Sequence, residues 1–317
     1  MQEGLFFENQ ITAANLAEIA KEQSKLEEKR ICEISELAYF AAETANQMLG
    51  DGYTVYEILS VLSEGIFTFE EKPHMNRLDE NVLKLTEYIK ITNTFDKVIF
   101  SEFFIKKLAD FGVRLKEEDF LFSDKGNETV TYVKNALADE AYDVFTQDFT
   151  DPRVKYSQSL KHAVKAVSAD EFEYCLLPLE ERGGARIGTT AELLFSEDLK
   201  INSVTPVFGF EGLADMKYAL VSKHFTIPEF TEGDDRYLEI RLRADSSASL
   251  SEIFLASDSL GALIYRVNGA EFATDEGPVA HYSVVLKSNS SDFCNILVYL
   301  TLFAGAYTPV GIYKNLE

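Results

Sequence analysis

Positively charged residues are scarce in this chain. Its 317 residues include 30 lysines and arginines against 53 aspartates and glutamates, which gives a formal net charge of −23. Binding to nucleic-acid phosphates requires a basic surface, and so does binding to anionic lipids. The charge balance therefore predicts no nucleic-acid partner and no membrane partner. The negative surplus does not identify a partner by itself, because it also favours solubility.

Cysteine and histidine are also few. The three cysteines and four histidines are spread along the chain, at no spacing typical of a zinc site or a disulfide framework. We therefore expect no metal and no cofactor. The sequence also lacks an apolar run of membrane-spanning length and an N-terminal signal of basic residues followed by apolar ones. A cytoplasmic protein is the default expectation.

The first part of the chain is predicted to be helical. Apolar residues recur at three- and four-residue steps, or sums of these, from Leu16 to Met48. Thr12 is a candidate cap, and the glycines at 50 and 52 mark the end of the helix. A helix of this length would pair with another helix, within the chain or across a dimer. Further helices are predicted over 55–62, 78–92 and 95–111, which gives a helical domain over 1–122.

The middle of the chain alternates strands with helices. Two helices, 139–145 and 159–167, separate three predicted strands, and two more strands follow. This βαβαβ order is typical of a parallel sheet. We expect an α/β domain over 128–226. Its strands are predicted at 129–133, 154–156, 174–177, 201–207 and 216–224.

A glycine-containing loop follows the third of these strands. It leads to a predicted helix that Thr189 or Thr190 would cap. A strand, a glycine loop and a helix N-terminus in this order form an anion site, because free N–H groups and the helix dipole point at the same place. The alternative is a plain connection with two solvated arginines. The ligand-binding candidates of this stretch are Arg182, Gly183, Gly184, Arg186, Thr189 and Thr190.

The end of the chain reads β-α-β-β-α-β after a linker at 225–235. This order is the ferredoxin-like plan. It predicts a domain over 235–317. The strands are expected at 237–242, 262–267, 281–286 and 310–314, and the helices at 249–256 and 292–303.

The glycine loop and its flanks resemble the second signature of the prephenate dehydratase family. That signature runs Pro-Ile-Glu-Asn-Ser, then a glycine, a valine and shortly Asp-Leu-Leu. Here it stands as Pro178-Leu179-Glu180-Glu181-Arg182, then Ala185, Ile187 and Glu192-Leu193-Leu194. The segment 159–170 is similar to the family's preceding helix, and the C-terminal quarter resembles the ACT domain that usually ends these enzymes.

The resemblance covers roughly 128–317 and implies an α+β multidomain chain. Its parts are the N-terminal all-helical domain, a single dehydratase-like α/β lobe with a mostly parallel sheet, and a C-terminal ferredoxin-like ACT domain. The family's Thr-Arg-Phe motif, which supplies a catalytic threonine, is matched by Met216-Lys217-Tyr218. The interval from Glu180 to Met216 is also too short for the family's second lobe. The resemblance is therefore to a divergent relative with altered catalytic motifs.

The resemblance also implies candidate site residues. An acid and a charge clamp for prephenate would have to come from Glu180, Glu181 and Lys217. In the family, the ACT domain binds phenylalanine across a dimer through two motifs. Their counterparts here contain Ser249, Leu250 and Arg266. The resemblance implies a homodimer through the ACT-like domain, and the length of the N-terminal helix makes that helix an alternative or additional dimer contact.

Three functions remain open. The first is a non-catalytic relative with a regulatory, sensing and assembly role, whose ligand is an aromatic amino acid or another small carboxylate. The second is an active prephenate dehydratase or chorismate mutase-type enzyme of phenylalanine biosynthesis. The long helix lacks the arginine pattern of the chorismate mutase family. The third is a structural or protein-interaction module that uses the long helix.

Overall fold

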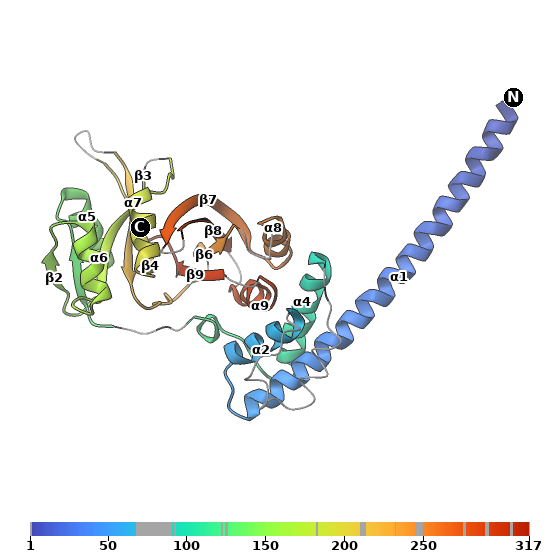
Figure 1. Ribbon diagram of the computed structural model, residues 1–317, viewed down its shortest axis with the longest axis horizontal. Helices are drawn as coiled ribbons and strands as arrows, with labels where there is room; N and C mark the ends of the chain where they lie inside the picture. Colours follow the sequence, from blue (N-terminus) through green and yellow to red (C-terminus); the bar gives the residue numbers. More distant parts are fainter. Residues whose placement is uncertain are drawn as a thin grey trace. The chain divides into compact units, whose positions relative to one another are not determined.

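The chain divides into two compact units (Figure 1), 1–53 with 60–114 and 54–59 with 115–317. The computed structural model describes residues 2–67, 91, 93–121, 123, 126–181, 183–209, 214–231, 233–244, 250–274, 277–288, 292–304 and 307–316.

The first unit contains the long helix that the apolar pattern predicts. This helix, α1 (Gln2–Gly50), begins earlier than the expected cap at Thr12 and packs against α4 (Thr94–Asp110). Alanines at 38, 41, 42 and 45 are buried on α1, which lets the bulky Phe100 and Phe104 of α4 approach closely. A third helix is α2 (Val55–Phe67). Of the helix predicted over 78–92, the structure describes residue 91 alone.

The predicted βαβαβ unit is present in the second unit. The strands β2, β1 and β3 lie in that order and run parallel. Asn135 and Ser159 accept the backbone N–H bonds that cap the two helices between them. The elements from here to the linker are η2 (Glu117–Asp119), β1 (Thr129–Tyr132), α5 (Ala136–Phe145), β2 (Arg153–Tyr156), α6 (Leu160–Ser168), β3 (Tyr174–Glu181), α7 (Gly188–Ser196), β4 (Lys200–Val207) and β5 (Met216–Ser222).

The expectation of a mostly parallel sheet in this lobe is wrong for its second half. Strand β5 lies between β3 and β4 and is antiparallel to both, so the lobe has two parallel and two antiparallel pairs. The physical reason is the connection. Only residues 208–215 connect β4 to β5, and a connection this short joins antiparallel strands.

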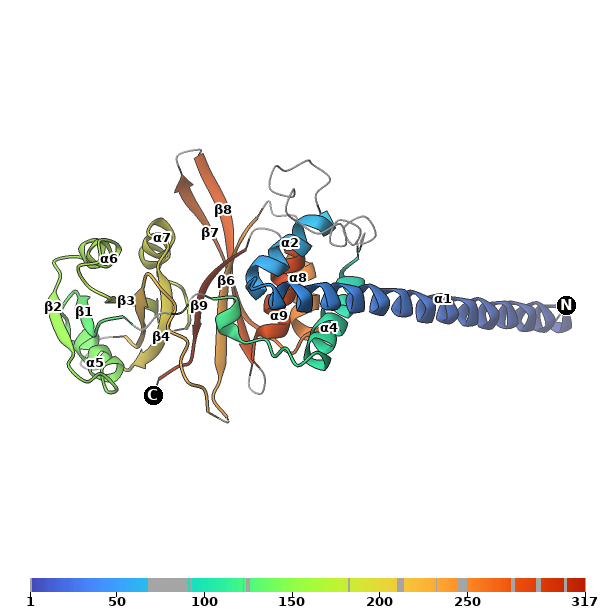
Figure 2. The same cartoon turned by 90° about the horizontal axis from the view of Figure 1, so that it is seen from below.

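The C-terminal part has the predicted β-α-β-β-α-β order. Its strands lie in the order β9-β6-β8-β7, all antiparallel to their neighbours. The helices α8 and α9 cover one face of these strands, and α7 of the lobe lies at the other face (Figure 2). The bounds are β6 (Arg236–Arg243), α8 (Leu250–Ser259), β7 (Leu263–Thr274), β8 (Gly277–Ser288), α9 (Cys294–Phe303) and β9 (Tyr307–Tyr313).

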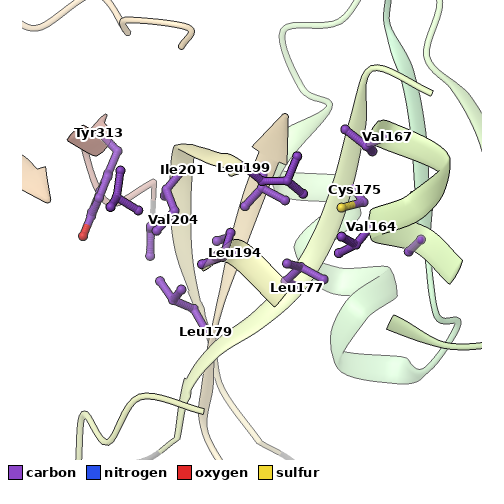
Figure 3. Close-up of a cluster of buried hydrophobic side chains, with 14 of the residues drawn as sticks. Val164, Val167, Cys175, Leu177, Leu179, Leu194, Leu199, Ile201, Val204 and Tyr313 are labelled. Carbon is purple, nitrogen blue, oxygen red and sulfur yellow. The ribbon is translucent and has the colours of Figure 1, made fainter. Parts of the chain in front are cut away.

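The two parts of the second unit share one nine-stranded sheet. Strand β9 runs parallel to β4, with Ile201 opposite Gly311. The chain after β9 continues this pairing, since the Leu316 N–H donates to the Val204 carbonyl at 2.8 Å. The same junction is apolar (Figure 3): Tyr313 of β9 packs in one buried cluster with Leu179, Val204 and other side chains of β3, β4, α6 and α7.

Candidate functional site

The loop between β3 and α7 folds back on itself as a tight turn. Gly183 and Gly184 have φ of 93° and 84°, a region that favours glycine. The Glu181 N–H donates to the Ala185 carbonyl at 3.0 Å, and Arg186 forms an isolated antiparallel bridge with Glu180. The glycines therefore return the chain beside its own strand, so that Glu180 and Arg186 lie together.

Glu180 is a buried carboxylate between two cations. Glu180 is 5% exposed, and its Oε1 is paired with Arg266 of β7. Its Oε2 lies 3.7 Å from Nζ of Lys217, which is its cross-strand neighbour on β5. Burial alone would raise the pKa of Glu180, but the hydrogen bond and charge of Arg266, with the charges of Arg186 and Lys217, lower it. Glu180 is therefore held ionised.

A second buried ion pair lies beside the first. Nη2 of Arg186 lies 2.7 Å from Oε2 of Glu239 on β6, and the two side chains are 8% and 4% exposed. The Ser283 hydroxyl donates to Oε1 of Glu239 at 2.7 Å, and the Tyr313 hydroxyl donates to Oε2 at 3.3 Å. Burial opposes the charge of Arg186, but Glu239 and Tyr313 outweigh it and raise the pKa of the guanidinium. Both oxygens of Glu239 are thus occupied.

Helix α7 begins at Gly188, and neither predicted threonine caps it. Its N-cap residue is Ile187, with no side-chain cap bond. Thr190 is instead fully buried, and its hydroxyl donates to the Pro178 carbonyl at 2.6 Å. Thr189 is exposed. The cap prediction is wrong because the helix starts two or three residues earlier than expected, which places both threonines inside it.

A cavity of about 330 Å³ opens between this loop, the first turns of α7 and the sheet face that α8 and α9 leave uncovered. We call it the arginine cavity. Its polar lining includes two arginines, Arg186 and Arg241, from different segments of the chain. The full lining is Ala185, Arg186, Gly188, Ala191, Leu194, Glu239, Arg241, Asn268, Gly269, Ala270, Phe272, His281, Ser283 and Val310.

Two buried donors in the arginine cavity lack a hydrogen-bond partner within the described part of the chain, and a second guanidinium has ring contacts there. Nη1 of Arg186 and Nδ2 of Asn268 are buried atoms with no hydrogen bond to any described residue. Arg241 likewise has no ion pair with a described carboxylate; its guanidinium lies over the ring of Phe195, 4.9 Å from the centroid. Burial lowers the pKa of Arg241, although a guanidinium stays protonated at neutral pH.

The sheet register brings these groups together. Ser283 lies opposite Asn268 on β7 and opposite Arg241 on β6, so the three form a row across the sheet. Glu239 lies two residues from Arg241 on the same strand and therefore on the same face. It holds Arg186 of the loop over that face. Arg186, Arg241 and Asn268 therefore surround the cavity on three sides and can donate to one anionic group in it.

A second hollow, of about 350 Å³, lies on the other side of the glycine turn. Lys217 and Arg266 line it together with two acidic residues, Glu181 and Asp215. Its cations are already paired with Glu180, and acidic and basic groups are balanced in number. This hollow therefore has less electrostatic preference for an anion than the arginine cavity.

The structure brings together residues from two separate predicted sites. Arg266, expected in the ACT-like motif, is paired with Glu180, expected in the loop motif. Gly184 is in contact range of Arg266, since a Cβ there would lie 2.9 Å from its Nη2. Leu250 begins α8 at the covered face of the sheet and lines neither cavity. Arg182 and Ser249 lie outside the described residues.

Sequence reasoning missed the residues that the sheet contributes. Glu239, Arg241 and Ser283 belong to no motif of the resemblance, and Asn268 lies in the stretch matched to the second ACT-domain motif, where only Arg266 is a predicted site residue. One signal was present: Glu239 and Arg241 are two apart within an otherwise apolar predicted strand, so they share one face. Charged residues inside a strand of a compact domain need partners.

In the ranges that the structure covers, no three His, Cys, Asp or Glu side chains are grouped so as to hold a metal ion. No helix in those ranges combines the length and the apolarity that crossing a membrane requires.

Comparisons with known proteins give likenesses in structure only. No family model and no curated protein matches the sequence. Prephenate dehydratase from Streptococcus mutans is 11% identical over 60% of this chain and 99% of its own, with a TM-score of 0.48. GqqA, described as a quorum quenching acylase, is 15% identical over 60% and 96%, with a TM-score of 0.45.

A second dehydratase, from Arthrobacter aurescens in complex with L-Phe, is 12% identical over 58% of this chain and 89% of its own, with a TM-score of 0.42. Prephenate dehydratases are thus among the structures to which this chain is similar, at low identity. Because the TM-scores are below 0.5, the chemistry of this site rests on its own residues.

Proposed function

We propose that this chain is a non-catalytic binding protein that senses a small carboxylate through the arginine cavity. The ligand carboxylate would accept hydrogen bonds from Arg186, Arg241 and Asn268. Its remaining atoms would contact the apolar part of the lining, which includes Leu194 and Phe272. A volume of about 330 Å³ is at the small end of ligand pockets, which suits a metabolite rather than a peptide.

The observation that carries the proposal is the state of Arg186. Its side chain is 8% exposed, yet only one of its terminal nitrogens is paired, and Nη1 has no partner in the described part of the chain. A buried donor without a partner costs roughly 1–3 kcal/mol, and more for a charged group. Such groups are uncommon in folded proteins. An anionic ligand at the cavity would satisfy Nη1.

The charge of the lining supports the same proposal. Arg186 and Arg241 contribute two positive charges against the single negative charge of Glu239. This local surplus of positive charge is found in a chain whose formal net charge is −23. Field lines concentrate in a cavity with apolar walls, so the surplus attracts small anions.

The lowered pKa of Glu180 favours a sensing role over catalysis. A general acid needs a pKa near the working pH. The ion pairs of Glu180 with Arg266 and Lys217 lower its pKa instead. Glu181, the other acidic candidate, is exposed at the end of β3. Glu180 is therefore disfavoured as a proton donor at neutral pH.

The test is a thermal-shift and calorimetric titration of the full chain with prephenate, phenylpyruvate and the three aromatic amino acids. A ligand that binds only the folded state raises the melting temperature. We expect at least one carboxylate to raise it. The variant Arg241→Met should weaken that binding at least about tenfold. Arg153→Met is the matched control, because Arg153 is an exposed arginine on β2, away from the cavity.

Two outcomes would overturn the proposal. If none of the probes shifts the melting temperature or releases heat, the cavity does not bind small carboxylates. If the chain forms phenylpyruvate from prephenate, and Glu180→Gln abolishes that turnover, the protein is an enzyme and the sensing role is wrong.

A further inference from the structure

We infer that the ligand of the arginine cavity is a carboxylate that lacks an α-ammonium group, so that the site rejects amino acids. This inference rests on the proposed function and specifies its ligand class. It follows from the hydrogen-bonding and charge balance of the lining.

An α-ammonium group needs acceptors, and a carboxylate is the strongest one a protein offers. Glu239 is the carboxylate in the described lining of the cavity. Its Oε2 is bonded to Arg186 and Tyr313, and its Oε1 accepts from Ser283. An ammonium group could pair with Glu239 only by displacing one of these buried partners, and each displacement would leave a buried donor unsatisfied.

The donors that remain all favour an anion. Nη1 of Arg186 and Nδ2 of Asn268 have no hydrogen-bond partner among the described residues, and the guanidinium of Arg241 lies over the ring of Phe195. Two of the three are positively charged. Like charges at close range in a buried site repel, so a ligand ammonium would be disfavoured by the same groups that attract its carboxylate.

The rest of the lining suits a hydrocarbon body. On α7 the lining residues Gly188, Ala191 and Leu194 are three apart and therefore share one face. On β7 they continue from Asn268 through Ala270 to Phe272 on one face of the strand. Thus both walls carry apolar side chains next to the donors. The ligand class that fits is an apolar monocarboxylic acid, with or without a 2-oxo group.

Matched pairs of probes that differ only in the α-ammonium group test this. The pairs are 3-phenylpropionate with L-phenylalanine, and 4-methylpentanoate with L-leucine. Isothermal titration of the full chain should give a dissociation constant at least about tenfold lower for the deamino member of one pair or both.

The variant Asn268→Asp sharpens the test, because it adds a carboxylate to the cavity. We expect it to weaken binding of the deamino acid and to raise the affinity ratio in favour of the amino acid. Asn268→Leu is the matched control: it removes the same donor without adding charge, so it should not favour the amino acid. The melting temperature of each variant checks that it is folded.

The outcomes separate this inference from the proposed function. Equal or tighter binding of the amino acids overturns the inference and leaves the carboxylate-binding function in place. No binding of any member of either pair, together with no response to the earlier probes, overturns both.

Discussion

At the scale of single residues, partners determine what each charged side chain can do. Glu180 and Lys217 resemble catalytic candidates in the sequence, but they are paired with each other, and Glu180 is also paired with Arg266. Arg186 resembles a solvated loop arginine, but its side chain is 8% exposed and paired with Glu239. The residue type sets which reactions or ligands a side chain could serve. Its buried partners then determine whether the side chain is free to do so.

The two adjacent glycines of the turn provide a residue-scale prediction. Both have positive φ, so alanine at either position should lower the free energy of unfolding by roughly 1–2 kcal/mol. At Gly184 the new Cβ would also lie 2.9 Å from Nη2 of Arg266, whereas at Gly183 it meets nothing within 4 Å. Gly184→Ala should therefore cost roughly 1–3 kcal/mol more than Gly183→Ala, because it disturbs the buried pair with Glu180. Urea denaturation measures both. Equal losses would show that Arg266 moves aside freely.

At the scale of elements, the start of α7 depends on a contact with its neighbouring strand. The sequence offers two adjacent threonines, and either would suit a helix cap. Thr190 is inside the helix and donates to the Pro178 carbonyl of β3, so it joins the helix to the sheet. The bond also fixes the first turn of α7 at the wall of the arginine cavity.

The neighbouring threonines make a matched pair of variants. Thr190→Ala removes a buried hydrogen bond and leaves the Pro178 carbonyl without that donor, so the free energy of unfolding should fall by roughly 1–3 kcal/mol. Thr189→Ala should change it by less than about 0.5 kcal/mol, because Thr189 is exposed. Thermal and urea denaturation test the difference. A larger loss at Thr189 would mean that it caps the helix after all.

At the scale of the second compact unit, the lobe and the ferredoxin-like strands are joined through one strand pair. Strands β4 and β9 meet where Ile201 lies opposite Gly311. Glycine at 311 permits this approach: a Cβ there would lie 2.6 Å from the Ile201 carbonyl oxygen. The junction also places the β3–α7 loop over the sheet face that contributes Glu239 and Arg241.

Gly311→Ala tests the junction. The added methyl group must push β9 away from β4, and overpacking of this kind costs roughly 1–3 kcal/mol. Amide hydrogen exchange should become faster in β4 and β9, and ligand binding should weaken with it. Gly269→Ala on β7 is the control, because its Cβ would lie 3.9 Å from the Tyr282 ring, an ordinary contact. Unchanged exchange in Gly311→Ala would show that the strand pair is not needed to hold the two parts together.

The sequence alone determined the order and type of most elements in the second unit. The βαβαβ unit and the β-α-β-β-α-β order were both predicted from local periodicity and turn residues. Both are local properties, because apolar spacing and capping residues act within a few positions of the chain. The end of α1 was likewise predicted from Gly50 and Gly52, and Gly52 has a φ of 92°.

The sequence could not determine which distant segments meet. The insertion of β5 between β3 and β4, the pairing of β9 with β4, and the ion pairs of Glu180 with Arg266 and of Arg186 with Glu239 all join residues far apart in the chain. No local pattern encodes such pairings, because they depend on sheet register and on which charges are buried together. The donors of the arginine cavity come from a loop of one predicted domain and two strands of another. Only the tertiary structure could place them at one site.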